Sequence, residues 1–143
     1  MGPREGTKGL FRAPTRMSSA LTNGILVTVR SQYISERSSL SAKQFAFAYT
    51  VTISNQGQAT AQLKSRHWII TDATGSMQEV RGEGVVGVQP VLAPGEEFEY
   101  TSWCLIATPN GSMRGSYQMV TSDGESFDAE IAAFGLNQPV MLN

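Results

Sequence analysis

The stretch FAFAYTVTISN, residues 45–55, decides the fold, because it has the cleanest two-residue alternation in the chain. Successive side chains of a β-strand point to opposite faces of a sheet, so one face of this stretch is large and apolar and the other is small. β-branched and aromatic residues pack well on such a half-buried surface. The stretch therefore predicts a central strand whose buried residues are Phe45, Phe47, Tyr49, Val51 and Ile53.

Segments on both sides of this strand alternate with the same period. They cover residues 25–33, 59–71, 77–80, 97–104, 116–119 and 126–133. Turn signals separate them, as at residues 55–57 and 72–75, and no stretch has a helical period. Seven or eight strands of this kind predict an all-β fold, an antiparallel β-sandwich of the immunoglobulin or fibronectin type III kind. The expected inner faces carry Val27, Phe47, Tyr49, Val51, Phe98, Tyr100, Tyr117, Phe127 and Ile131.

Composition and charge limit the classes of function. The chain has 143 residues, enough for one domain with a sizeable core, and charged residues make up only 16%. Its net charge of −1 divides into +3 over residues 1–16 and −4 over the remainder. A mildly acidic body predicts no nucleic-acid partner, and the lack of a run of about 18 apolar residues predicts no membrane insertion. The single cysteine, Cys104, has no partner for an internal disulfide, which favours a reducing, cytoplasmic compartment.

The first residues differ in pattern from the rest of the chain. Residues 1–16 show no periodicity and are rich in glycine and proline. We expect residues 1–17 to form a flexible leader and residues 18–143 to form the sandwich domain. The leader is interpreted as a cloning remnant or an extension from an upstream start codon, and a transit-like targeting segment is the third alternative.

Four strings in the sandwich region resemble the ApaG domain family. They are FAFAYTVTISN (45–55), SRHWIITDATG (65–75), QEVRGEGVVGVQPVLAPGEEFEYTS (78–102) and GSYQMVTSDGESFDAEIAAF (115–134). The resemblance runs from about Ile25 to Phe134, and the one departure is the bulky Trp103 before Cys104. It implies a fibronectin type III-like sandwich in a small bacterial cytosolic protein linked to cobalt resistance and magnesium efflux. Similar domains in some eukaryotic F-box proteins and in a polymerase-delta-interacting protein look like protein–protein interaction modules.

Residues 82–87, GEGVVG, match the G-x-G-x-x-G pattern of dinucleotide-binding loops. The pattern works there because a helix follows and its N-terminus attracts the pyrophosphate. Here Pro90 soon interrupts the chain and no helix is expected. One interpretation is a glycine-rich connection between edge strands. The other is a small nest of backbone amides that binds phosphate or pyrophosphate together with Arg66 and Arg81.

The only histidine, His67, lies on an expected strand, where Arg66 and Trp68 share one face and His67 occupies the other. It is either a base, metal ligand or anion contact, or a half-buried structural residue. A lone histidine is a poor metal site. Asp72, Glu79 and Glu83 could supply oxygen ligands for magnesium, although the sequence does not show that they converge. Cys104 has no adjacent positive charge and is interpreted as a structural residue.

The sequence favours a non-enzymatic binding module without a cofactor, a metal site or catalytic residues. Its partner is an unidentified protein or a phosphate-containing ligand, and pairing of exposed strand edges suggests a homodimer. The alternative is a phosphate- or pyrophosphate-binding protein, or an enzyme that acts on a phosphate ester or diphosphate with His67 as acid or base. The candidate binding surface consists of Arg66, His67, Arg81, Gly82, Gly84 and Gly87.

Overall fold

The computed structural model describes residues 16–139. Most of the expected leader, residues 1–15, lies outside this part of the chain. The first strand begins at Arg16, so the last two residues assigned to the leader belong to a sheet.

The described residues contain nine β-strands and one short 3-10 turn, η1 (Ser35–Arg37). The predicted all-β sandwich is confirmed. The strands are β1 (Arg16–Thr22), β2 (Ile25–Tyr33), β3 (Phe45–Asn55), β4 (Ala61–Asp72), β5 (Met77–Glu83), β6 (Val91–Leu92), β7 (Glu97–Ile106), β8 (Asn110–Thr121) and β9 (Ser126–Asn137).

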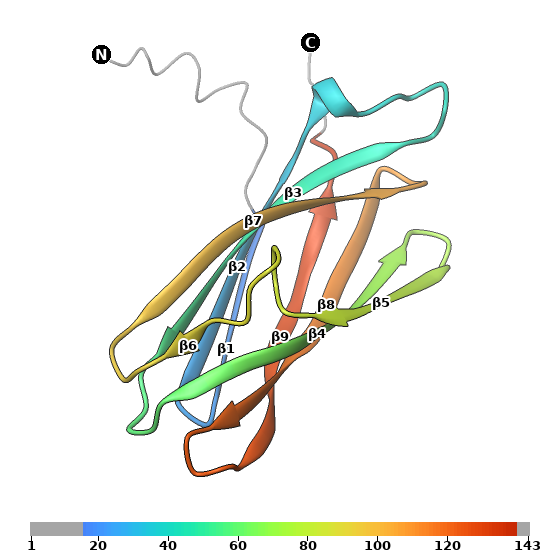
Figure 1. Ribbon diagram of the computed structural model, residues 1–143. Helices are drawn as coiled ribbons and strands as arrows, with labels where there is room; N and C mark the ends of the chain where they lie inside the picture. The colour runs from blue at the N-terminus through green and yellow to red at the C-terminus, as the bar shows by residue number, and fades with distance from the viewer. Residues whose placement is uncertain (1–15, 140–143) are drawn as a thin grey trace, which may run out of the picture.

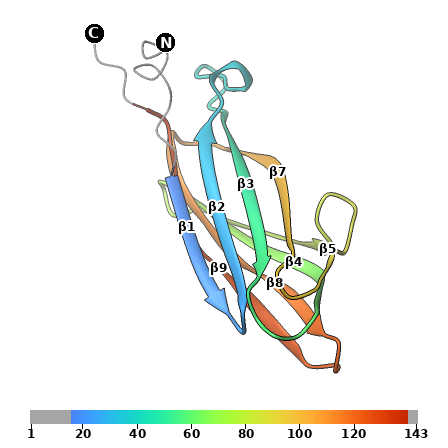
Figure 2. The same ribbon diagram turned by 90° about the vertical axis from the view of Figure 1, so that its left-hand side faces the viewer.

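The strands form two antiparallel sheets that pack face to face (Figure 1). One sheet has the order β1-β2-β3-β7, and these strands lie side by side in Figure 2. The other has the order β5-β4-β8-β9, with the short β6 paired to the start of β4. The stretch FAFAYTVTISN forms β3, which pairs with β2 on one side and β7 on the other. Its predicted central position is therefore confirmed.

The core lies between the inner faces of the two sheets. Alternate residues of β2 and β3 are buried, as the period of two requires. Of the nine residues expected inside, seven are buried, and Phe98 and Phe127 are half-buried against the same cluster. Trp68 is 2% exposed and packs edge-on against Tyr117 and Phe134. The largest fully buried side chains are those of Tyr117, Phe47, Ile25, Ile53, Leu63, Met113, Met119, Ile131 and Leu136.

Direct hydrogen bonds join the two sheets along one side, where β1 and β2 meet β9. The Ser18 hydroxyl donates to the Ala132 carbonyl at 2.8 Å, and the Ser31 hydroxyl donates to the Gly135 carbonyl at 2.7 Å. The opposite side is bordered by the edge strands β5 and β7, which no hydrogen bond joins within residues 16–139. The sandwich is therefore closed along β1 and β9 and open along β5 and β7.

Three strands differ from the sequence expectation, and one of them is the two-residue β6, which lies between the expected segments 77–80 and 97–104. β1 was not expected, yet it pairs with residues 25–31 of β2 through a tight turn at Asn23 and Gly24. Both turn residues have positive φ, 48° and 80°, as a two-residue hairpin turn requires. β8 begins at Asn110, six residues before the expected segment 116–119. In residues 16–139 no helix has the length and hydrophobicity needed to cross a membrane.

Candidate functional site

The glycine-rich segment connects β5 to β6, and no helix follows it. Gly84, Val86 and Gly87 have φ values of 63°, 43° and 82°. A valine at positive φ is rare because its branched side chain crowds the backbone. Three amides of the loop already have acceptors: Gly84 donates to the Lys64 carbonyl, and Val85 and Val88 exchange bonds of 2.8 and 2.9 Å. These three amides are therefore occupied by carbonyl oxygens and are not free to bind an anion.

The Arg66 side chain forms hydrogen bonds with the backbone of this loop. Its Nη1 donates to the carbonyl oxygens of Glu83 at 2.9 Å and Gly84 at 2.8 Å. The guanidinium lies against Gly82, where an added Cβ would be 2.8 Å from Cζ. A side chain at position 82 would therefore displace the Arg66 guanidinium from its present position. In this conformation the loop offers the carbonyl oxygens of two residues to Arg66.

His67 lies on the opposite face of β4 from Arg66, as the alternation predicts. Its Nε2 is 2.7 Å from Glu79 Oε2, and an Arg81 nitrogen lies 3.5 Å from the same oxygen. The hydrogen bond with His67 is the main cause that lowers the pKa of Glu79. The expected binding surface is therefore split: Arg66 with Gly82 and Gly84 faces inward, whereas His67 with Arg81 faces outward. Gly87 stands apart at the loop tip.

The three acids considered for magnesium lie in separate environments. The Asp72 carboxylate accepts hydrogen bonds from the Thr74 amide and hydroxyl and from the Ser76 amide, and the Thr74 hydroxyl is the main cause that lowers its pKa. Glu79 bonds His67, and Glu83 ends β5. Across residues 16–139, no group of three or more His, Cys, Asp or Glu side chains is arranged to hold a metal ion.

Cys104 faces the interior, where its thiol donates to the Met113 sulfur at 3.7 Å. Burial raises the pKa of this thiol to about 12. It is therefore protonated at neutral pH and is a poor nucleophile. His67 points outward from the other sheet, so the only cysteine and the only histidine of the chain do not form a catalytic pair.

A hollow of about 460 Å³ opens between the edges of β5 and β7. Its size is in the range of ligand-binding pockets. The lining comes from five strands, which explains why no single motif revealed it. The lining includes the polar side chains Arg66, Gln78 and Ser102 and the phenol of Tyr49, and the other lining residues are Trp68, Ile70, Val80, Trp103, Cys104, Leu105 and Met113.

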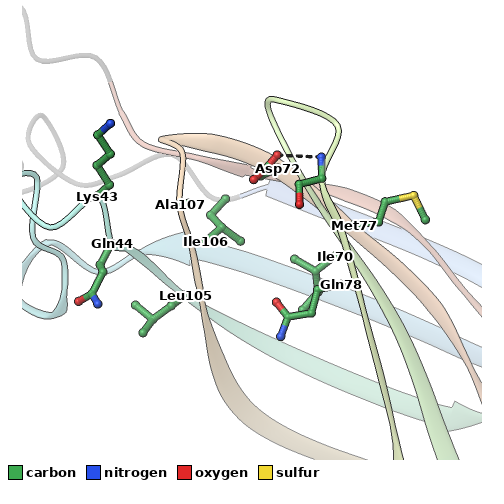
Figure 3. Close-up of a pocket in the computed structure, with 10 residues that line it drawn as sticks. Lys43, Gln44, Ile70, Asp72, Met77, Gln78, Leu105, Ile106 and Ala107 are labelled. Atoms are coloured by element: carbon green, nitrogen blue, oxygen red, sulfur yellow. Dashed lines mark hydrogen bonds between the residues drawn. The ribbon is translucent and has the colours of Figure 1, made fainter.

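A second hollow of about 350 Å³ continues toward the β4–β5 turn and shares Ile70, Gln78 and Leu105 with the first. Figure 3 shows Leu105 and Gln44 on one side and Ile70 and Gln78 on the other. We call the two hollows together the β5–β7 cleft. Asp72 lies at its end and is bonded within its own turn (dashed line in Figure 3).

Arg66 is the one cation that lines the larger hollow of the cleft. Within residues 16–139 it forms no ion pair with a carboxylate. Tyr49, Tyr100 and Tyr117 lie near enough to feel its charge, but burial raises the pKa of all three phenols, so they stay neutral. The floor of the cleft therefore carries an uncompensated positive charge in an otherwise acidic body.

The edge of β7 beside the cleft is open and uncharged. β7 pairs only with β3 in the described part of the chain, and residues 101–106, TSWCLI, contain no charged side chain. Trp103 is 49% exposed and Leu105 is 41% exposed. The Arg37 guanidinium lies 5.4 Å from the centre of the Trp103 ring. Natural edge strands are usually blocked by charges, so this half-strand is available for pairing.

Comparison with known proteins identifies a family. The model of the ApaG domain matches residues 35–121. Protein ApaG of Anaeromyxobacter dehalogenans strain 2CP-C is 59% identical over 127 residues, which cover 89% of this chain and 100% of that protein. Protein ApaG of Methylobacterium sp. strain 4-46 is 56% identical over 123 residues, 86% of this chain and 95% of that protein.

Solved structures agree with the sequence relatives. A crystal structure described as an ApaA protein from Bordetella pertussis matches with a TM-score of 0.79 and 53% identity, covering 82% of this chain and 95% of that chain. None of these names states an activity or a ligand. The site itself must therefore support any statement about function.

Proposed function

The chain belongs to the ApaG domain family, and from this premise we propose that it is a non-enzymatic module that holds an extended segment of a partner protein in the β5–β7 cleft. The observation that carries the proposal is the uncharged edge of β7, unpaired within residues 16–139, beside a hollow lined by both polar and apolar side chains. An extended segment can add to such an edge as a further strand, with main-chain hydrogen bonds for affinity and side-chain pockets for specificity.

The chemistry of the cleft supports binding over catalysis. Its titratable lining groups are Arg66, Tyr49 and Cys104 in the larger hollow. Burial keeps the phenol and the thiol protonated at neutral pH, so neither can act as a base or a nucleophile there. His67, the candidate base, faces away from the cleft.

The proposal includes the cellular role that the family resemblance implies. A role in cobalt and magnesium homeostasis would run through the protein partner, in a cytoplasmic setting that the unpaired Cys104 also favours. The sequence-based alternative, a phosphate or pyrophosphate ligand at the glycine-rich loop, stays a prediction. The internal bonds of the Gly84, Val85 and Val88 amides do not favour it.

Site-specific photo-crosslinking in bacterial cells tests the proposal. A photoreactive amino acid replaces Leu105 at the cleft, and in a control it replaces Leu21, which is 62% exposed on the closed side. We expect a defined adduct from position 105 alone, with the crosslink mapped by mass spectrometry to one extended segment and lost in a Trp103→Glu background. Equal adducts from both positions, or adducts unaffected by Trp103→Glu, would contradict the proposal.

A further inference from the structure

We propose that the segment held in the β5–β7 cleft is acidic as well as apolar. One carboxylate of the segment binds the Arg66 guanidinium, and an apolar side chain two residues away fills the hollow beside Ile70 and Leu105. This inference rests on the proposed function and names the chemistry of its partner.

Arg66 is prepared for an anion. An arginine has five N–H donors, and Nη1 uses its two on the carbonyls of Glu83 and Gly84. The donors of Nε and Nη2 have no protein acceptor within residues 16–139. The loop bonds and the contact with Gly82 fix the plane of the guanidinium, so a ligand does not have to order this side chain. A charge-assisted bond to a carboxylate is the strongest interaction this group can form in an apolar setting.

The larger hollow, which contains Arg66, is lined by no carboxylate from residues 16–139. Of the described residues, Asp72 is the one acid that lines the smaller hollow, and its Oδ1 already accepts hydrogen bonds from Thr74 and Ser76. Lys43 stands at the far rim, and its side chain points away from the others in Figure 3. The residues after the first 16 carry 7 basic and 11 acidic side chains, so the cleft floor is positive within an acidic body. This contrast selects an acidic segment over a basic one.

The spacing of the segment follows from strand geometry. The uncharged edge, residues 101–106, spans roughly 20 Å at about 3.3 Å per residue, so it matches a segment of about six residues. Side chains two positions apart point the same way. If an acidic residue of the segment binds Arg66 in the larger hollow, the residue two positions away in the segment points into the same cleft. There it lies near Leu105 and Ile70, which line both hollows.

Calorimetry with two capped six-residue peptides tests the inference on the full chain. One peptide alternates valine and threonine around a central glutamate, and the other has glutamine in place of the glutamate. We expect the glutamate peptide to bind at least about tenfold more tightly, with the difference shrinking at high salt. The fluorescence of Trp103 should shift to shorter wavelength with the glutamate peptide, because binding covers its exposed ring.

Variants at Arg66 distinguish the effect of its charge on peptide binding from an effect on the fold. Arg66→Gln should abolish the preference for the glutamate peptide. Arg66→Lys keeps the positive charge but loses the planar guanidinium with its paired donors, so it should retain part of that preference. Arg81→Gln on the outer face is the matched control and should leave the preference unchanged. Thermal unfolding of each variant identifies any loss of the fold. If Arg66→Gln does not fold, the peptide preference of Arg66→Lys tests the role of the guanidinium.

Three outcomes would overturn the inference. Equal affinities of the two peptides for the cleft would show that the carboxylate does not contribute to binding, and the proposed function would still stand. Binding of neither peptide would exclude this occupant, while crosslinking at position 105 still decides the proposed function. A dimer in solution that Trp103→Glu dissociates would assign the cleft to a second copy of the chain.

Discussion

At the residue scale, the clearest energetic feature is the pair of buried phenols at Tyr100 and Tyr117. Their hydroxyl oxygens are 2.5 Å apart in the core, and Tyr117 is fully buried. Tyr117→Phe should cost about 1–3 kcal/mol of unfolding free energy, because it leaves the Tyr100 hydroxyl without this partner. Chemical denaturation measures this loss.

The double variant Tyr100→Phe with Tyr117→Phe provides the control for that prediction. Replacing both partners by apolar groups of similar shape is often nearly neutral. The double variant should therefore be more stable than Tyr117→Phe alone. Additive losses in the two single variants would show that the hydroxyl pair does not act as a unit.

The outward-facing cluster of His67, Glu79 and Arg81 gives a pH prediction. The folded-state pKa of Glu79 is lowered, first by the hydrogen bond with His67, so its contribution to stability is present above the ordinary carboxyl pKa and is lost as pH falls through the lowered value. Carbon-13 titration of the Glu79 carboxyl should give a low midpoint that rises in His67→Ala. Arg81→Ala should raise it less, and a larger effect of Arg81 would contradict this assignment.

At the scale of elements, Asn55 fastens the short strand β6 to the end of β3. Its Nδ2 donates to the carbonyls of Ala59 and Leu92 at 2.8 and 2.9 Å, and its Oδ1 accepts from the Gly57 amide at 2.9 Å. Asn55→Ala should lose about 3 kcal/mol of stability, at about 1 kcal/mol for each bond. Gln56→Ala, at the exposed neighbour, is the control. Equal unfolding free energies for the two variants would refute this role.

The strands were predictable where the hydrophobic pattern was strong. β3 alternates large and small residues over its whole length, and the structure places it centrally. β1, RMSSALT, has no regular alternation of large apolar and polar residues, and it directly follows the aperiodic leader. The Asn23-Gly24 pair was the signal that could have revealed it, because such pairs favour two-residue hairpin turns between strands.

The candidate site was only partly predictable. Alternation correctly placed Arg66 and His67 on opposite faces of β4, which already argues against one surface containing both. The glycine pattern drew attention to the loop, but the role of Gly82 depends on contact with Arg66, sixteen positions earlier in the chain. The β5–β7 cleft combines side chains from five strands, and only the packing of the two sheets brings them together.

At the scale of the whole molecule, the sandwich is closed along one side and open along the other. Ser18 and Ser31 bond across the sheets to β9, whereas no such bond joins β5 to β7 within residues 16–139. Native-state hydrogen exchange should therefore be slowest in the central strands β3 and β8 and fastest in β5 and the free edge of β7. Uniform protection of both sides would contradict a sandwich that opens along β5 and β7.

The central claim is that binding occurs in the β5–β7 cleft and that the glycine-rich segment is a structural connector. The most direct test is a map of backbone amide shifts in nitrogen-15 spectra of the full chain, titrated with the glutamate peptide. The account predicts the largest shifts in residues 101–106 and at Arg66, Gln78 and Val80, with β1 unchanged. Shifts centred on Val86, Gly87 and Arg81, or no shifts at saturating peptide, would contradict it.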